Sequence, residues 1–524
     1  MKTKAKQYLQ TLTKETVLPY EYDPKYLPDI AILLPQIEKC KETNTHIFIY
    51  GDFDADGICA TTIMTLGLQY FLEDTGIEVF YKTPERDQGH GLRESILDEA
   101  LEKNCSLVIS VDTGSNDKEI IDIYKEKGLF FIITDHHPIQ IQESELTYPL
   151  INPLRGYKDP YLCGSGVAYK IIRYLEEAYK KDISEKLLKK IQVLTLIATV
   201  ADMVPLRNEN LFFIIEFRDL FFEDISQYSR VLSEIIKQYN IEPSQGKFIG
   251  FWLAPLLNWA WRLNKSNYVI DLLIKEEKYW PEYIELGVKY LGELNTYRKE
   301  LVDQWKQYIE YKGLRKVYKN ISVAVGLNIP SGIKRLIAHQ YLEDPITISF
   351  CGSLSAYGYV SASVINKSKV DIISFLQEKD YISNIWGHKA AFWFSYKKAK
   401  EQKLLEDISY FIESQDIKQG EEEKELIKLE GKRLEELREL ALLHKYCIWG
   451  TELEEPLFYS HIEIERQSLL KEKHLKIEAR TELGEKVVIL SWNRIQKFEQ
   501  KEISIEHTID INSYDNTIQY FLPS

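Results

Sequence analysis

The stretch HIFIYGDFDADG (residues 46–57) joins an apolar run to three closely spaced aspartates. The run HIFIY (46–50) is typical of a strand that is buried on both faces, and Asp52, Asp54 and Asp56 follow it directly. In an open parallel sheet, ligands bind beyond the carboxyl ends of the strands. The stretch therefore predicts a strand of an α/β lobe with a polar site at its end.

Two later apolar runs repeat this arrangement. LVISV (107–111) and LFFIIT (129–134) also run into polar residues, and each is followed by a stretch long enough for a helix. A helical pattern over 185–200 precedes one more acid. The side chains that these segments deliver are Asp112, Asp135, His136, His137 and Asp202.

The rest of the chain changes pattern several times. Helical patterns fill the region after the first lobe, mixed patterns follow, then a charged helical stretch, and period-2 alternation dominates the end. We expect an α/β lobe at 1–210, a helical connector at 211–312, a smaller α/β lobe at 313–403, a helical linker at 404–445 and an all-β, OB-like domain at 446–524.

Composition narrows the class of protein. The 524 residues are 44% hydrophobic and 28% charged, with 25 Gly and 17 Pro, which are globular values. The six cysteines form no CxxC pair, which argues against a disulfide framework and a structural zinc site. The first twenty residues lack the apolar stretch of a signal peptide, and no run approaches the length of a membrane helix. We expect a cytoplasmic protein with no membrane partner.

Charge is unevenly distributed along the chain. The net charge is −14, yet residues 311–403 hold 14 Lys/Arg against 6 Asp/Glu, a local balance of +8. A basic segment in an acidic chain is a candidate phosphate-binding surface. An ordinary solvated surface with uneven charge is the alternative.

The clustered acids indicate a site for divalent cations. Carboxylates that gather at one sheet edge raise each other's pKa unless a cation neutralises them. His136 would add a nitrogen donor, and mixed oxygen and nitrogen ligands suit Mn²⁺, Mg²⁺ or Fe²⁺. A single Asp at such a position is more simply a helix N-cap, but three acidic strand ends and a His pair are poorly explained by capping alone.

These motifs resemble a known family. GDFDADG (51–57), VDTG (111–114), TDHHP (134–138) and VADMVPL (200–206) are similar to the four motifs of the DHH phosphoesterase superfamily. Segments 84–92, 151–171, 253–263 and 293–301 resemble the RecJ branch, and parts of the last two hundred residues resemble its DHHA1 and OB-fold domains.

The resemblance implies a 5′→3′ exonuclease that hydrolyses single-stranded DNA to mononucleotides with two Mn²⁺ or Mg²⁺ ions. It implies a role in DNA repair, recombination or replication, and a single-strand binding protein or a helicase as a partner. The implied metal ligands are Asp52, Asp54, Asp112, His136 and Asp202; His137, Asp135 and Asp56 are the implied catalytic and supporting residues. The expected substrate contacts are Arg86, Ser165, Arg262, Arg298, Trp386 and His388.

Several positions depart from the branch. Tyr50 stands where some members have an additional His ligand, and Trp386 replaces the first Gly of a Gly-Gly-His motif. No Arg accompanies the serine-rich segment 361–363, and Leu256 and Trp261 replace an Arg and a Gly. A divergent, phage-type member would carry such changes. Trp386 could stack on a base or pack against the second lobe's sheet.

Two other functions are compatible with the motifs. A DHH phosphodiesterase acting on short oligoribonucleotides or cyclic dinucleotides would share the metal motifs but usually lacks an added β domain. A non-catalytic scaffold would have no need to retain every acid together with His136. The β domain at 446–524 favours a polymer substrate, because an OB-type surface binds a strand through stacking and phosphate contacts.

Overall fold

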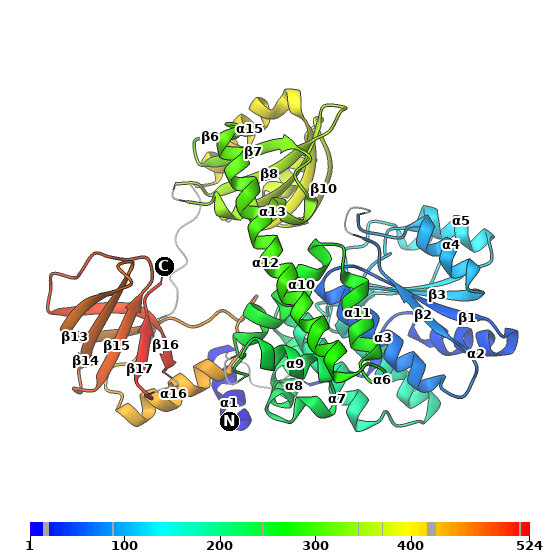
Figure 1. The fold of residues 1–524 in the computed structure, drawn as a ribbon, viewed down its shortest axis with the longest axis horizontal. Helices are drawn as coiled ribbons and strands as arrows, with labels where there is room; N and C mark the ends of the chain where they lie inside the picture. The colour runs from blue at the N-terminus through cyan, green and yellow to red at the C-terminus, as the bar shows by residue number, and fades with distance from the viewer. Residues whose placement is uncertain are drawn as a thin grey trace.

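The computed structural model describes residues 1–524 apart from 14–19, 86–88, 244–245, 344, 369, 417–425, 513–514, 524 and the side chains at 13, 261, 386, 388 and 416. Four regions follow one another along the chain: an α/β lobe, a helical connector, a second α/β lobe and a β-barrel domain (Figure 1). Within the described ranges, no helix combines the length and the hydropathy that a membrane span requires.

The first lobe is built on a five-stranded parallel sheet. Its strand order is β2-β1-β3-β4-β5, so the chain starts near one edge and winds outward to both sides. The strands that the apolar runs predict are present as β1, β3 and β4, whereas β2 and β5 are short and were not predicted. The strands are β1 (His46–Gly51), β2 (Val79–Lys82), β3 (Cys105–Val111), β4 (Phe130–Thr134) and β5 (Leu150–Ile151).

Helices cover both faces of this sheet. One face carries the larger core, and the other packs against a smaller apolar cluster. Both faces of the strands are therefore buried, which explains why the strands are continuous apolar runs. The first face is covered by α2 (Leu33–Thr43), α3 (Ala55–Phe71), α6 (Gly164–Tyr179) and α7 (Glu185–Ala201); the second by α4 (Glu94–Glu102) and α5 (Lys118–Glu126).

The connector is helical, as its pattern predicts. Its last helix, α12, is 31 residues long and runs from the connector to the second lobe (Figure 1). The helices are α8 (Asn208–Phe217), α9 (Arg230–Gln238), a π-helical turn (Ile249–Leu253), α10 (Ala254–Arg262), α11 (Ser266–Lys275) and α12 (Pro281–Tyr311).

The second lobe contains a six-stranded mixed sheet in the order β10-β11-β9-β8-β7-β6. Only the β7–β8 pair is parallel among the described pairings of this sheet. Its strands are β6 (Arg315–Tyr318), β7 (Ile321–Leu327), β8 (Ile348–Leu354), β9 (Tyr359–Asn366), β10 (Ile382–His388) and β11 (Ala391–Lys397). Its helices are α13 (Ser331–Gln340), α14 (Ile372–Gln377) and α15 (Glu401–Asp416).

The C-terminal domain is a closed, OB-like barrel. Strands β13, β14, β15, β17 and β16 are hydrogen-bonded in that order, and β13 pairs with β16 to close the ring. Alternate residues of these strands are buried, which accounts for the period-2 pattern in the sequence. The strands are β12 (Ile427–Lys428), β13 (Phe458–Leu470), β14 (His474–Thr481), β15 (Lys486–Ser491), β16 (Glu502–Ile511) and β17 (Ile518–Phe521).

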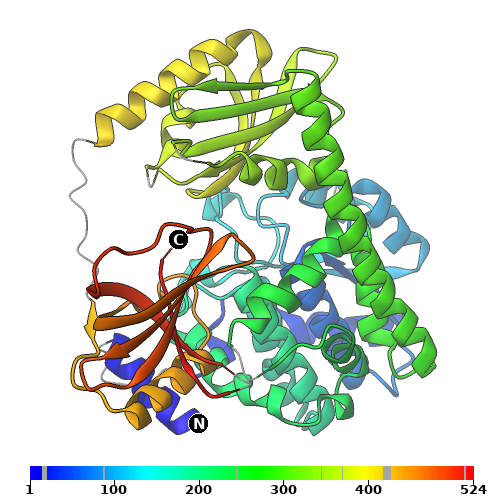
Figure 2. The same ribbon diagram turned by 60° about the vertical axis from the view of Figure 1, so that its left-hand side comes forward.

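The helices of the predicted linker at 404–445 are integral to the two domains that flank it. In α15, Leu404 and Ile408 are buried in the core of the second lobe. Helix α16 (Leu434–Tyr446) buries Leu437 in the barrel core. Both helices are rich in charged residues, so their narrow apolar stripes are difficult to recognise in the sequence. Helix α15 therefore packs with the second lobe and α16 with the barrel, rather than forming a separate linker. The N-terminal helix α1 (Lys2–Thr13) packs against α16, although the two helices lie near opposite ends of the sequence (Figure 2).

The buried Arg218 fastens α16 to the connector. Its guanidinium lies 4.9 to 5.1 Å from the ring centroids of Phe222, Phe248 and Tyr446, and it donates to the carbonyl oxygen of Pro243. The Tyr446 hydroxyl in turn donates to Asp219. Desolvation lowers the pKa of Arg218 to about 10, so the guanidinium remains charged at neutral pH. Three aromatic faces and a carbonyl stabilise this buried cation.

We therefore expect Arg218→Ala to weaken the attachment of the barrel domain. Loss of the desolvated cation–π contacts and a hydrogen bond should lower the free energy of unfolding by on the order of 2–4 kcal/mol. Thermal unfolding and limited proteolysis around 446–457 would measure this, with the exposed Arg438→Gln in α16 as the control. Equal protease resistance of the two variants would contradict this role for Arg218.

Candidate metal centre

The predicted acids meet at the carboxyl ends of β1, β3 and β4. Hydrogen bonds join the three strand ends in a row: Asp52 N donates to the Val111 carbonyl oxygen (3.3 Å), Asp112 N to that of Thr134 (2.9 Å) and Asp135 N to that of Ile151 (3.1 Å). Adjacent parallel strands thus end at the same level, and the acids that follow them are side by side. The expectation that these residues form one cluster is confirmed.

Asp52 and Asp54 belong to the turn between β1 and α3. Asp54 caps α3, and its Oδ1 accepts hydrogen bonds from the amides of Asp56 (3.0 Å) and Gly57 (3.1 Å). The N-cap interpretation is therefore correct for Asp54, and it leaves Oδ2 available for a ligand. Asp52 is 2% exposed, and its Oδ1 has no hydrogen-bond partner among the described residues.

Asp112 adopts a left-handed backbone conformation with φ of 61°, a region that Asp tolerates better than most residues. The first residue of α6, Gly164, packs directly against it. A Cβ atom on Gly164 would lie 2.5 Å from Asp112 Oδ1, so only glycine permits this approach. The close contact brings the N-terminus of α6 to the carboxylates.

His136 joins the strand-end acids to Asp202. Its Nε2 lies 3.2 Å from Asp112 Oδ1, 3.5 Å from Asp202 Oδ2 and 3.9 Å from Asp56 Oδ2. Asp202 is the C-cap residue of α7 and so reaches the site from a different element. One imidazole nitrogen therefore faces three carboxylates.

His137 is held by Asp135. Asp135 Oδ1 accepts from the amides of His136 and His137 and lies 2.8 Å from His137 Nδ1, while its Oδ2 accepts from Ser115 N. Burial alone would favour neutral forms, but the ion pair holds the pKa of Asp135 well below its usual range and raises that of His137 to about 10. His137 is consequently a cation at neutral pH, and its ring is about a quarter exposed.

Asp56 and Ser165 have roles that differ in part from those expected. Asp56 accepts hydrogen bonds from the amides of Gly164 (2.6 Å) and Ser165 (2.8 Å) at the N-terminus of α6, so these amides fix its carboxylate. Ser165, however, is fully buried, and its hydroxyl donates to the Asp56 carbonyl oxygen. We correct the expected phosphate contact, because the Ser165 side chain faces α3 and has no access to a substrate.

The carboxylates destabilise one another's charged forms. Burial first, and then the neighbouring acids, raise the pKa of Asp54 to about 6 and hold those of Asp112 and Asp202 well above their usual range. Mg²⁺ and Mn²⁺ bind carboxylate oxygens, and Mn²⁺ also accepts imidazole nitrogens as ligands. Among the described residues, three triads have donor atoms within 4.8 Å of one another, and two of them together include all five expected ligands: Asp52, Asp54 and Asp112; Asp56, His136 and Asp202. The third joins Asp112, His136 and His137. The residues fit a divalent cation.

Arg262 of the connector and Arg335 of the second lobe lie in the electrostatic field of Asp54, and Arg298 lies in that of Arg262. Arg262 Nη1 donates to the Gly332 carbonyl oxygen (2.9 Å), and the Arg298 guanidinium lies 5.4 Å from the ring centroid of Trp259. Desolvation, assisted by Arg335 and Arg298, lowers the pKa of Arg262 to about 9, whereas Asp54 opposes the shift. Arg335 in α13 experiences the same field of Asp54. Sequence analysis missed Arg335, because an Arg on a helix carries no motif of its own.

Other expected substrate contacts are placed only in part. Arg86 lies outside the described residues, as do the side chains of Trp386 and His388, whose backbones belong to β10. Trp386 pairs with Trp393 across the β10–β11 ladder, and the Trp393 indole donates to Ser361 Oγ (2.8 Å). The choice between stacking and packing for Trp386 thus stays open.

Part of the basic segment is neutralised within the second lobe. Lys398 pairs with Glu401, and Lys403 lies 3.2 Å from Asp407. Such pairs are typical of a solvated surface and reduce the charge that this segment can offer to phosphates.

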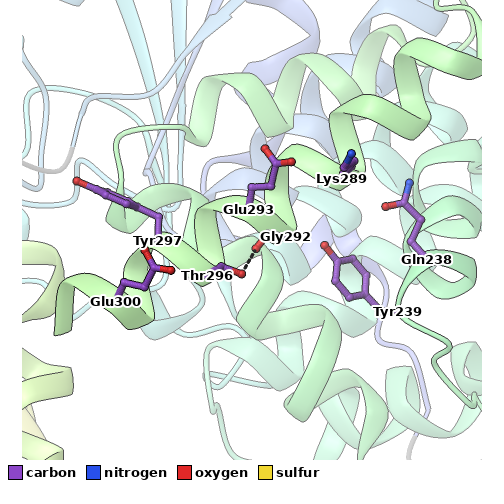
Figure 3. A pocket seen from close by; sticks show the side chains of 8 residues that line it. All are labelled: Gln238, Tyr239, Lys289, Gly292, Glu293, Thr296, Tyr297 and Glu300. Atoms are coloured by element: carbon purple, nitrogen blue, oxygen red, sulfur yellow. Dashed lines mark hydrogen bonds between the residues drawn. The ribbon is translucent and has the colours of Figure 1, made fainter. Parts of the chain in front are cut away.

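A groove of about 460 Å³ lies away from the acids, between α9 and α12 (Figure 3). Tyr239 and Tyr297 flank it, and the Thr296 hydroxyl donates to the Gly292 carbonyl oxygen at its base (3.2 Å). The groove contains none of the metal-centre residues, so it is separate from the site described above.

Comparisons with known proteins agree with this arrangement. Residues 46–199 match the DHH family, N-terminal domain. The single-stranded-DNA-specific exonuclease RecJ of Bacillus subtilis is 31% identical over 304 residues, which is 56% of this chain and 36% of that protein. The enzyme of the same name from Haemophilus influenzae is 28% identical over 317 residues, 57% of this chain and 52% of that protein. This chain thus spans about a third to a half of these relatives.

A solved structure is similar over nearly the whole chain. The crystal structure of RecJ in complex with Mn²⁺ from Thermus thermophilus superposes with a TM-score of 0.76 at 18% identity, covering 95% of this chain and 72% of that one. The likeness extends through the second lobe and the barrel, and it confirms the fold class expected from the sequence.

Asp54→Asn should stabilise the metal-free protein. The pKa of about 6 lies above the ordinary 3.8, so ionised Asp54 costs stability above pH 6. The gain on substitution, on the order of 2 kcal/mol, should shrink as the pH falls and vanish below about pH 4, since the wild-type carboxyl is then protonated in both states. Asn retains the N-cap.

Chemical denaturation of metal-free protein between pH 4 and 8 would test this expectation. The exposed Asp74→Asn serves as the matched control. A destabilised Asp54→Asn protein at pH 8 would show that Asp54 is not repelled by its neighbours.

Proposed function

We propose that this chain, which matches the DHH family, N-terminal domain over residues 46–199 and is similar to RecJ exonucleases, is a metal-dependent exonuclease acting on single-stranded DNA. The proposal rests on one observation: acidic side chains and basic side chains lie next to one another at this site. A buried cluster of carboxylates that can hold cations lies beside His137, Arg262 and Arg335. Cations would neutralise the acids, and the site as a whole would then attract a phosphodiester.

The cations supply the chemistry that no side chain here provides. Two bound divalent ions, Mn²⁺ or Mg²⁺, would supply an activated water and neutralise charge on the leaving oxygen. The residues that would hold them are Asp52, Asp54, Asp112, His136 and Asp202.

The protein's own residues position these ligands and the phosphate. Asp56 is fixed by the amides of α6, and its Oδ2 lies 3.9 Å from His136 Nε2. The His137 imidazolium, aligned by Asp135, presents a positive charge at the edge of the cluster where a non-bridging phosphate oxygen would lie. Asn152 donates to the His137 carbonyl oxygen (3.0 Å) and to Ser115 Oγ, so it fixes the His-His turn from the far side.

The substrate form follows from the placement of the arginines. Arg262 contacts Gly332 of α13, so the second lobe packs against the connector beside the metal centre. A single strand with its unpaired bases can follow such a surface, whereas a duplex is about 20 Å wide and rigid over this length. The OB-like barrel favours a polymer substrate over a dinucleotide. We propose 5′→3′ polarity and release of mononucleotides, in repair, recombination or replication of DNA.

A first functional expectation concerns which DNA the protein cleaves, single-stranded or duplex, and from which end. With Mn²⁺, a 5′-phosphorylated single strand should be degraded from its 5′ end, and blunt duplex of the same sequence should resist. Strands labelled at either end, together with a dinucleotide, would separate the possibilities. Label appearing first from the 3′ end would refute the polarity, and faster cleavage of the dinucleotide would favour a small-substrate phosphodiesterase. Asp54→Asn is the inactive control.

A second functional expectation concerns the contact between Arg335 and the phosphates of the substrate. Arg335→Gln should lower kcat/KM on single strands by about 10- to 100-fold, the loss of a charge-assisted contact to phosphate. In an Asp54→Asn background, each lost phosphate contact should also reduce the salt slope of strand binding by about 0.7. Arg438→Gln should change neither quantity. An unaltered salt slope in Arg335→Gln would assign this side chain to lobe packing alone.

A further inference from the structure

His90 lies at the metal centre although no motif assigns it a role. Its Nδ1 is 3.3 Å from Asp52 Oδ2, and its ring centroid is 4.5 Å from that of Phe53. Asp52, the carboxylate that His90 faces, belongs to the β1–α3 turn. About half of the His90 side chain is exposed, whereas that of Asp52 is buried.

The loop that carries His90 is fixed to the sheet at several points. The Tyr50 hydroxyl, at the end of β1, donates to the Gly91 carbonyl oxygen (3.0 Å), and Leu92 N donates to Asp117 Oδ2 (2.8 Å). The Arg93 guanidinium donates to the His90 carbonyl oxygen. Gly91 has φ of 92°, and a Cβ there would lie 2.8 Å from the Asp117 carboxylate. These contacts hold the imidazole above Asp52.

Asp52 itself lacks a complete set of partners. Its Oδ1 is buried with no hydrogen bond among the described residues, while Oδ2 faces the His90 nitrogen. A buried carboxylate oxygen without a donor is costly unless a cation is bound to it. Two donors on neighbouring corners of an octahedral ion lie about 3 Å apart, which is close to the observed separation.

We propose that His90 is a nitrogen ligand for the cation held by Asp52 and Asp54. The proposal rests on the cation-dependent function proposed above and deepens it. His136 faces the other triad, with Asp56 and Asp202. Each cation would then have one imidazole, and a nitrogen donor favours Mn²⁺ over Mg²⁺, which prefers oxygen ligands. Tyr50 acts through the loop and is a positioning residue.

The test counts bound Mn²⁺ and its nitrogen ligands in the full-length, metal-free protein. Titration followed by the EPR signal of free Mn²⁺ gives the number and affinity of sites, and pulsed EPR of the bound ions gives the nitrogen couplings. We expect His90→Gln to weaken one of two sites by about tenfold or more and to remove one imidazole coupling. The exposed His339→Gln should match the wild type.

Tyr50→Phe supplies a second measurement. Phe keeps the buried ring and removes only the hydroxyl that anchors Gly91, so we expect a smaller loss of affinity at the same site with the nitrogen coupling retained. Unchanged nitrogen couplings in His90→Gln would overturn the proposal and leave His90 as a hydrogen-bonded neighbour of Asp52. Two intact sites of wild-type affinity would overturn it as well.

These readouts are independent of nuclease activity. A protein that binds two Mn²⁺ ions through His90 but does not cleave single-stranded DNA would contradict the proposed function alone. Active protein with an unaffected Mn²⁺ titration in His90→Gln would contradict the ligand role alone.

Discussion

Repulsion between buried carboxylates is the constraint on which the site depends. Asp52, Asp56 and Asp112 are each 2% exposed, and their charges raise the pKa values of the neighbouring acids. Left alone, such a cluster would take up protons or open the strand ends. A sequence that retains it at the expense of stability retains it for a ligand, and divalent cations are the ligands that convert mutual repulsion into attraction.

The surrounding fold brings the acids together and limits their movement. The strand ends are aligned by the parallel register, Gly164 permits α6 to approach Asp112, and the amides at the start of α6 neutralise part of the charge of Asp56. Asp135 is excluded from the repulsion because its ion pair with His137 keeps it ionised. One elongated helix, α12, then connects this rigid platform to the lobe that carries Arg335.

The parts of this arrangement that sequence could predict are those with a local signature. The apolar runs before Asp52, Asp112 and Asp135 predict buried strands, and parallel topology places their ends together. Ser165 and Arg335 could not be assigned in this way. Ser165 lies in the first turn of α6, where its amide and hydroxyl both donate to Asp56. Arg335 meets the site only through the packing of α13 on the connector. The packing of the segment 404–445 could not be predicted for a related reason. Helices α15 and α16 are highly charged, and each buries only a narrow apolar stripe in the adjoining domain.

Anomalous diffraction at the Mn²⁺ edge from crystals of the full chain tests the central claim most directly. We predict two peaks about 3.5–4 Å apart, one beside Asp52 and Asp54 and the other beside His136 and Asp202, with Asp112 between them. Crystals grown with Mn²⁺ that show these carboxylates without any anomalous peak would contradict the account, because the acids would then be held together by protonation rather than by cations.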